Sequence, residues 1–270
     1  MQSKKVKIKI CGITNEQDVK FVNKYKPDMI GFVFASSKRR ITCEQAIYLS
    51  GLLDKRILRA GVFVNEDLKR LLATARHCRL DIIQLHGDET ESYIRKLQDL
   101  ISMCNTSCNS LNTSENTIKN INANTDKDLN IYTTKTETTT ATTTATATKT
   151  EIKVWRPYIW KSLRIKNNII PVSNCNNYGG VDGFVLDSYR NESYGGTGKS
   201  FNWNITAGYG SLLNIILAGG LTPENVQEAI NIVKPFAVDV SSGVETDGYK
   251  DEIKIKNFVN AVRAINKTQT

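Results

Sequence analysis

The chain has 270 residues and a formal net charge of +9, with 40% hydrophobic and 8% aromatic residues, a composition typical of a globular protein. No apolar run reaches the roughly 18 residues that a membrane helix needs, and the first residues lead into a strand pattern without an export signal, so we expect a cytoplasmic protein with no membrane partner. The basic residues are dispersed and not interleaved with aromatics, which argues against nucleic acid and fits a small anionic ligand.

Cysteine and histidine spacing indicates no metal site. The chain has six cysteines and two histidines, and no two cysteines have C-x-x-C spacing. We therefore expect no bound metal and reduced thiols. The cysteines are Cys11, Cys43, Cys78, Cys104, Cys108 and Cys175.

Short apolar segments alternate along the chain with segments of helical periodicity. Eight such units, with only a weak helical signal behind the fifth, predict an α/β protein with a single (β/α)₈ (TIM) barrel; a doubly wound open sheet is the alternative. The expected strands are Val6–Cys11, Met29–Phe34, Leu58–Val64, Asp81–Leu85, Tyr158–Ile165, Val181–Asp187, Asn214–Leu217 and Phe236–Val240.

Capping residues stand where several of the helices should begin. Thr14 and Thr42 each precede a glutamine at the spacing of a capping box, and Asn65 and Asp88 are also good N-caps. A further helix is expected to start at Thr222-Pro223.

One segment departs from this pattern. From Asn105 to Thr150 the chain is rich in Asn and Thr, with few apolar residues. Ordering such a segment would cost entropy that no buried face offsets. We predict a disordered insertion at 105–150, before the fifth strand of a single domain spanning 1–270.

Function in such a barrel should lie at the carboxyl ends of the strands. Cys11 ends the first strand and shares a face with Lys7 and Lys9. A neighbouring lysine would lower the pKa of the thiol and populate the thiolate. The alternative is an inert buried cysteine.

Other polar residues occupy the ends of later strands. Asp187 ends the sixth strand, where it could act as a general acid or merely as a cap. Gln84 and His86 share a face of the fourth strand, and His86 could equally be a packed histidine. The cations of Ser37–Arg40 follow the second strand; an arginine there suits a carboxylate, unless the loop is only solvated.

Three glycine-bearing turns follow the last three strands: Gly195–Gly198, Ala218–Gly220 and Ser241–Gly243. Each alone could be an ordinary turn. Together, the last two predict a phosphate cradle of backbone N–H groups. We call Gly219, Gly220, Ser241, Ser242 and Gly243 the phosphate loops.

These residues stand in an ordered set of motifs that resembles the phosphoribosylanthranilate isomerases. The resemblance covers nearly all of the chain outside the insertion. Its segments are Lys9–Thr14, Gly61–Asn65, Ile83–Gly87, Leu186–Ser188, Gly195–Gly198, Phe201–Trp203, Leu217–Leu221, Pro223–Val226, Val238–Glu245 and Lys250–Asp251.

The resemblance implies a cofactor-independent Amadori rearrangement of a phosphorylated ribosyl-arylamine. Cys11 matches the family's general base, and Asp187 matches its general acid. Arg39 matches the arginine that contacts the anthranilate carboxylate, with Arg40 as the alternative because Lys38 replaces the usual proline.

The same resemblance assigns the remaining binding positions. Asp239, Gln84 and His86 are expected to contact substrate, and the phosphate loops to hold its phosphate. Neither the residues nor the resemblance indicates an oligomeric state.

Two other functions remain open from the sequence. Another barrel isomerase or epimerase of sugar phosphates could share the phosphate loops, although Cys11 distinguishes this chain from the related two-aspartate isomerases. A non-catalytic barrel that binds a phosphorylated ligand is the second alternative.

Overall fold

The computed structural model describes residues 5–110, 154–165, 175, 178–188, 203 and 213–268. Met1–Ile101 and Arg156–Thr270 form one compact unit, and Ser102–Trp155 forms another. Most of the predicted insertion, residues 111–150, lies outside the described residues. The preceding helix continues to Ser110, within the range predicted as insertion.

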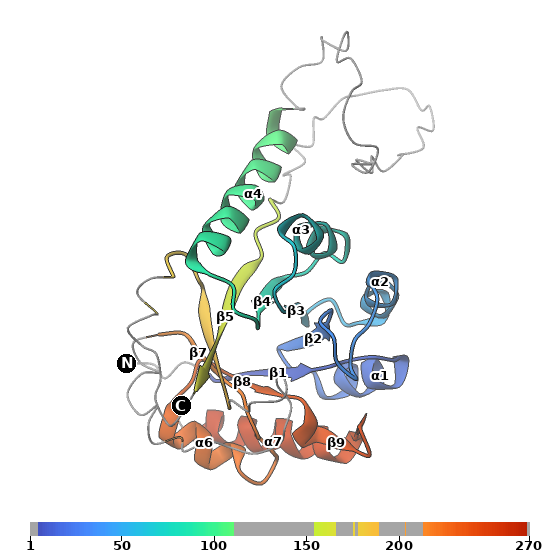
Figure 1. Ribbon diagram of the computed structural model, residues 1–270. Helices are drawn as coiled ribbons and strands as arrows, with labels where there is room; N and C mark the ends of the chain where they lie inside the picture. Colours follow the sequence, from blue (N-terminus) through green and yellow to red (C-terminus); the bar gives the residue numbers. More distant parts are fainter. Residues whose placement is uncertain are drawn as a thin grey trace, which may run out of the picture. The chain divides into compact units, whose positions relative to one another are not determined.

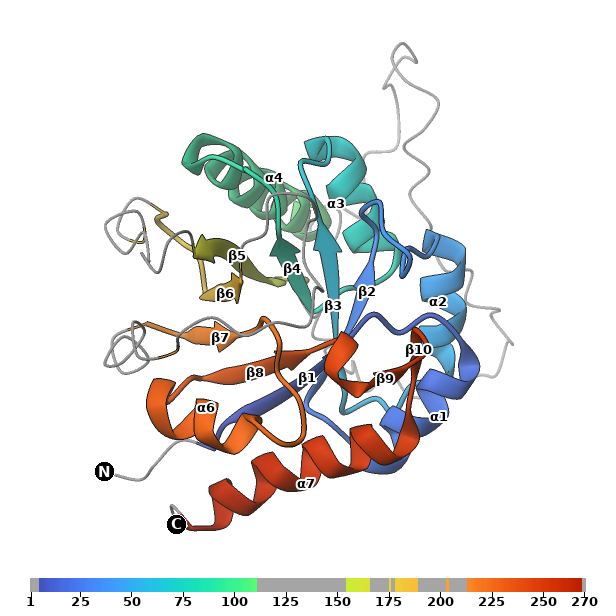
Figure 2. The ribbon, with the colours of Figure 1, turned by 60° about the horizontal axis from the view of Figure 1, so that its bottom comes forward.

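Eight parallel strands close into a barrel in which β1 pairs with both β2 and β8 (Figures 1 and 2). This confirms the predicted barrel and excludes the open sheet. Every strand end lies within two residues of its expected position. The strands are β1 Lys7–Cys11, β2 Met29–Val33, β3 Leu58–Phe63, β4 Ile82–Leu85, β5 Tyr158–Ile165, β6 Gly183–Ser188, β7 Ile215–Leu217 and β8 Ala237–Val240.

Helices surround the ring of strands (Figure 2). Apolar side chains of these helices are buried, as Ile94 and Leu97 illustrate. The helices expected in the fifth and sixth units, behind β5 and β6, fall largely outside the described residues. The described helices are α1 Glu16–Tyr25, α2 Cys43–Leu52, α3 Leu68–His77, α4 Glu91–Ser110, α6 Val226–Val233 and α7 Glu252–Thr268; the short η3 Ser242–Val244, β9 Glu245–Thr246 and β10 Tyr249–Lys250 follow β8.

Only one of the predicted helix starts is confirmed. Thr42 caps α2 with the complete capping box to Gln45. The prediction for α1 is wrong by one residue: Asn15 is the N-cap and accepts from the Asp18 N–H, while Asp18 accepts from the Thr14 N–H. Asparagine supplies the capping oxygen, and the carboxylate of Asp18 bonds the residue before the cap instead of the cap itself, so the capping box is incomplete.

The other three helices begin later than predicted. Asp67, not Asn65, caps α3. The side chain of Asn65 instead accepts from the Asp88 N–H, so these two residues join the loops after β3 and β4. α4 begins at Glu91, and α6 begins at Val226, behind Asn225 as its N-cap, three residues after Pro223.

The barrel interior is apolar below the mouth. One buried cluster draws residues from each of β2 to β8, an arrangement that only the inside of the barrel permits. β1 contributes Lys9 to the interior, and its side chain is fully buried. Members of the cluster are Met29, Ala60, Ile82, Trp160, Val185, Ile216, Ala218 and Ala237.

Aspartates stabilise the opposite, amino-terminal rim. Asp28, Asp81 and Asp182 lie just before β2, β4 and β6. Each accepts the backbone N–H of the preceding strand at 2.8–2.9 Å, from Ile8, Arg59 and Ile159 respectively. These carboxylates satisfy backbone donors that would otherwise lack an acceptor.

Candidate active site

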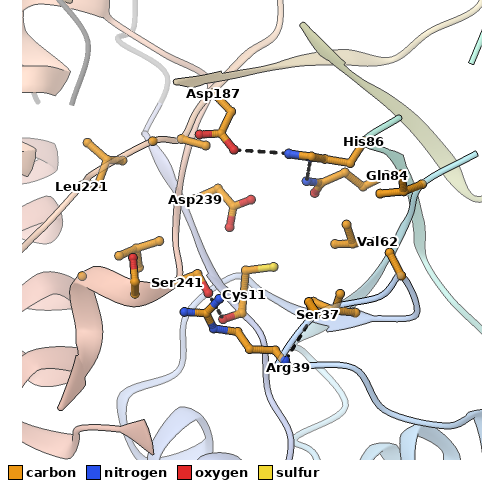
Figure 3. Close-up of a pocket in the computed structure, with 18 of the residues that line it drawn as sticks. Cys11, Ser37, Arg39, Val62, Gln84, His86, Asp187, Leu221, Asp239 and Ser241 are labelled. Carbon is orange, nitrogen blue, oxygen red and sulfur yellow. Dashed lines mark hydrogen bonds and ion pairs between the residues drawn. The ribbon is translucent and has the colours of Figure 1, made fainter. Parts of the chain in front are cut away.

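A pocket opens at the carboxyl ends of the strands (Figure 3). All five residues of the phosphate loops line it. So do the six other residues singled out from the sequence, namely Cys11, Arg39, Gln84, His86, Asp187 and Asp239. Arg40 is exposed and is not among the lining residues, so the geometry favours Arg39 over Arg40.

Gly31 makes room for the thiol of Cys11, which points into the cavity (Figure 3), and Gly12 makes room for Arg39. A Cβ on Gly31, in the neighbouring strand, would lie only 2.7 Å from the Cys11 sulfur. Gly12 turns the chain out of β1 with φ +80°, and a Cβ there would lie 2.4 Å from Cδ of Arg39. A Cβ at Gly31 would therefore displace the thiol, and one at Gly12 would displace Arg39.

Lys9 lies beneath Cys11 but does not populate its thiolate as predicted. Its ammonium donates to Asp239 Oδ2 at 2.7 Å. Burial lowers the pKa of Lys9, but Asp239 and Cys11 together outweigh this effect and the pKa rises above its ordinary value, so Lys9 is charged.

The expected lowering of the Cys11 pKa is wrong. Burial raises the pKa of the thiol, Lys9 lowers it, and Asp239 raises it again, so that the net shift is upward. The expectation considered only the charge of Lys9. It left out the Asp239 carboxylate, which neutralises that charge, and the free-energy cost of burying a thiolate.

Asp187 lies at the end of a hydrogen-bonded chain across the mouth (Figure 3). His86 Nε2 lies 3.2 Å from Asp187 Oδ2, and His86 Nδ1 lies 3.3 Å from Gln84 Nε2. If the amide donates to Nδ1, the ring proton is on Nε2 and is donated to Asp187. The two residues expected only to contact substrate therefore also orient the Asp187 carboxyl.

Two buried acceptor oxygens of pocket-lining residues have no hydrogen-bond partner among the described residues. Within the described part of the chain, neither Asp239 Oδ1 nor Gln84 Oε1 receives a hydrogen bond. An unpaired buried acceptor costs about 1–3 kcal/mol. A ligand that donates to these oxygens would recover this free energy.

Arg39 reaches the pocket from the loop after β2 and is held by Glu245. Its Nε and Nη2 donate to the two carboxylate oxygens at 2.6 and 2.7 Å. Lys250 donates to Glu245 Oε1 at 2.7 Å. No role was predicted for Glu245 or Lys250, although both lie in the motifs Val238–Glu245 and Lys250–Asp251.

The two phosphate loops pack against each other. Gly219 and Gly220 have φ of +80° and +70°. A Cβ on Gly243 would lie 1.8 Å from the carbonyl oxygen of Leu221, so only glycine allows this approach. The turn Gly195–Gly198 lies outside the described residues.

The buried ion pair of Lys161 and Glu89, which was not predicted from the sequence, supports the loop that follows His86. Lys161, on β5, donates to Glu89 Oε2 at 2.9 Å and to the Gly87 carbonyl at 2.8 Å. Glu89 in turn accepts from the N–H groups of Gly87 and Asn65. A buried lysine on a strand was the available signal, but its partner is 72 residues away.

The described residues contain no group of three or more His, Cys, Asp or Glu side chains placed to hold a metal ion. Among the helices in the same ranges, none has the length and apolar character to span a bilayer.

Comparison with known proteins identifies the family. The model of the N-(5′-phosphoribosyl)anthranilate (PRA) isomerase family matches residues 8–129 and 141–261. The N-(5′-phosphoribosyl)anthranilate isomerases of Thermoanaerobacter sp. (strain X514) and Clostridium acetobutylicum are each 40% identical over 260 residues, covering 96% of this chain and 99% and 98% of theirs.

Solved structures agree. The phosphoribosyl anthranilate isomerase of Thermotoga maritima superposes with a TM-score of 0.69 at 31% identity, covering 96% of this chain and 99% of its own. Another phosphoribosyl anthranilate isomerase, in complex with reduced 1-(o-carboxyphenylamino)-1-deoxyribulose 5-phosphate, has a TM-score of 0.66 at 29% identity, with the same coverage. The chain therefore belongs to the N-(5′-phosphoribosyl)anthranilate isomerase family.

Proposed function

We propose that the protein converts N-(5-phosphoribosyl)anthranilate to 1-(2-carboxyphenylamino)-1-deoxyribulose 5-phosphate by general acid–base catalysis, as a step of tryptophan biosynthesis. The observation that carries the proposal is that the Cys11 thiol and the Asp187 carboxyl, from β1 and β6, line one cavity (Figure 3). Acid and base can then act on a single bound sugar. Family membership and the complex of the 29%-identical relative support the same substrate class.

The first step opens the ribose. Protonated Asp187 donates its proton to the ring oxygen, the C1′–O bond breaks, and the nitrogen lone pair forms the C1′=N bond of a protonated Schiff base. Because His86 occupies Oδ2 of Asp187, Oδ1 is the oxygen available to the substrate. Hydrogen bonding through His86 and Gln84 orients the carboxyl.

The second step moves a proton at C2′. The Cys11 thiolate removes it, and the C–H electron pair forms an enolamine that tautomerises to the aminoketose. Because the pKa of Cys11 is raised, the thiolate is a minority species at neutral pH, but it is a correspondingly stronger base. The two steps transfer one proton from Asp187 to the substrate and one from the substrate to Cys11, and exchange with solvent returns Asp187 and Cys11 to their starting protonation states, so the proposal requires no cofactor.

Binding groups surround these two residues. In our proposal the phosphate lies against the N–H groups of the phosphate loops, and Arg39 binds the anthranilate carboxylate. Asp239 Oδ1 accepts a hydrogen bond from a substrate N–H or hydroxyl group, which would satisfy its unpaired position. A small phosphorylated substrate is the only partner that the proposal requires.

We place this reaction in the cytoplasm. Five cysteines of the described residues, including the pair Cys43 and Cys78 with sulfurs 2.8 Å apart, are free thiols. Thiols so close together are stable against oxidation only in a reducing compartment.

The direct test is to supply N-(5-phosphoribosyl)anthranilate to the purified full-length chain and follow the loss of its fluorescence. We expect enzyme-dependent loss together with formation of the aminoketose, identified by chromatography. An unchanged signal, with conversion of another sugar phosphate, would establish a sister isomerase. Phosphate-ligand binding without turnover of any substrate would establish a non-catalytic barrel.

A further inference from the structure

The contact between Arg39 and Glu245 uses only one side of the guanidinium. Glu245 accepts from Nε and Nη2, the lateral edge of the planar group. A guanidinium carries five N–H donors in a fixed fork. Among the described residues Glu245 alone accepts from the guanidinium, so the Nη1–Nη2 end keeps donors for a second, bidentate carboxylate. Arg39 lines the pocket beside Cys11 (Figure 3).

Glu245 is itself held in place from behind. Lys250 donates to its Oε1 at 2.7 Å and to the carbonyl of Ser241 at 3.1 Å. Glu245 and Lys250 also face each other across the β9–β10 ladder, and the side chains of both are at most 5% exposed. A ligand carboxylate would therefore not displace Glu245 from Arg39. It would instead bind the Nη1–Nη2 end of the guanidinium.

The protonation of Glu245 agrees with this arrangement. Burial raises the pKa of its carboxyl, but the hydrogen bond from Arg39 and the charge of Lys250 outweigh burial, and the net shift is downward. Glu245 is therefore ionised at neutral pH and matches the lateral edge of Arg39 in charge as well as in shape.

We propose that Glu245 is a positioning residue, supported by Lys250, that presents the free end of Arg39 to the carboxylate of the arylamine. It sets the preference of the enzyme for a carboxylated over an uncarboxylated arylamine and touches none of the reacting atoms. This inference rests on the proposed function and adds the residues that determine specificity. The opposing hypothesis is that Glu245 competes with the substrate for Arg39.

The test compares two substrates on the full-length enzyme: N-(5-phosphoribosyl)anthranilate and N-(5-phosphoribosyl)aniline, which lacks the carboxylate. For Glu245→Gln we expect kcat/KM for the anthranilate substrate to fall at least tenfold, mainly through KM, because the amide cannot accept two hydrogen bonds from Arg39. We expect kcat/KM for the aniline substrate to stay within about twofold of wild type. Equal losses on both substrates would indicate a structural role, and a lower KM for the anthranilate would indicate competition; either result overturns the proposal.

Further variants separate positioning from folding. Arg39→Lys keeps the positive charge but has a single ammonium for two carboxylates, so we expect kcat/KM to fall selectively for the anthranilate substrate. This variant tests the proposal even if Glu245→Gln fails to fold. An unchanged preference for the carboxylated substrate would contradict the proposal. Adding Glu245→Gln to Arg39→Ala should cause no further loss. Arg40→Met, which removes the adjacent exposed cation, is the matched control and should leave both substrates unaffected.

The two proposals fail in different ways. Wild-type protein that leaves N-(5-phosphoribosyl)anthranilate unchanged would overturn the proposed function and this inference with it. Wild-type protein that turns it over, while Glu245→Gln and Arg39→Lys keep the full preference for the carboxylated substrate, would overturn only the inference.

Discussion

Carboxylates at the two ends of the barrel have different partners. At the amino-terminal rim, Asp28, Asp81 and Asp182 each accept a backbone N–H of the neighbouring strand; Asp28 and Asp81 also pair with the Lys7 and Arg59 side chains, so the backbone hydrogen bond is what all three share. At the mouth, Asp187 and Asp239 pair with side chains, and Asp239 keeps one oxygen unpartnered among the described residues. The rim carboxylates thus satisfy backbone N–H groups of the barrel, whereas the mouth retains acceptor oxygens for a ligand. A variant at the mouth should therefore impair catalysis, and one at the rim stability.

Substitution of the two proposed proton-transfer residues should cause the largest loss of activity. We expect Asp187→Asn and Cys11→Ala each to lower kcat by about 10² or more, the usual scale of acid–base catalysis. The melting temperature and the affinity for product should change little, because neither side chain is the acceptor of a backbone N–H group of the barrel. Steady-state kinetics and calorimetric titration with product measure the two quantities. Near-normal turnover in both variants would mean that the chemistry lies elsewhere.

A smaller loss should follow from crowding the thiol without removing it. In Gly31→Ala the new Cβ would stand 2.7 Å from the Cys11 sulfur, and we expect kcat to fall by about 10- to 100-fold, because a displacement of about 1 Å can cost 10²-fold. Gly51→Ala is the matched control, since a Cβ on that residue of α2 meets no atom within 4 Å. Equal kcat values for the two variants would contradict the role of Gly31.

The Lys9–Asp239 pair should control the titration of Cys11. Asp239 raises the pKa of the thiol and Lys9 lowers it, so Asp239→Asn should lower that pKa, and alkylation of Cys11 should begin at lower pH. Below the pKa the thiolate fraction rises tenfold for each unit that the pKa falls, which outweighs the lower nucleophilicity of a less basic thiolate. Peptide-resolved mass spectrometry of iodoacetamide labelling against pH measures this shift in the substrate-free protein. A shift to higher pH would show that Asp239 stabilises the thiolate.

At the rim we expect a cost in stability alone. Asp182→Ala deprives the Ile159 N–H of its acceptor, and the free energy of unfolding should fall by about 1–2 kcal/mol. Asp182→Asn keeps an acceptor oxygen and should recover most of the loss. Denaturant unfolding gives the stability, and kcat should remain within twofold of wild type. A large loss of kcat in a folded Asp182→Ala variant would contradict the division between rim and mouth.

The smallest effect should come from removing residues 105–150. None of the site residues lies in this range, and the length of a connecting segment changes loop-closure entropy only slowly. We expect the shortened chain to keep kcat within a few-fold of wild type in the fluorescence assay. Loss of folding, detected by circular dichroism, would show that the segment contributes to the barrel.

Much of the fold follows from local sequence. Strand periodicity placed all eight strands within two residues, because alternation and helical period depend on neighbouring residues alone. Helix starts were less predictable, because several consecutive residues could each serve as the N-cap. Which of them does so depends on the contacts of the surrounding loops. Asn65, for example, serves the Asp88 N–H in another loop instead of its own helix.

The sequence alone determined which residues stand at strand ends, and therefore that Cys11, His86 and Asp187 meet at one mouth. Only the tertiary structure decided the partners there: Asp239 neutralises Lys9 across 230 residues, and Glu245 fixes Arg39 across 206. The reason is physical. Which residues end a strand depends on local backbone geometry, whereas pKa values and the orientation of charged side chains depend on burial and on charges that only barrel closure brings together.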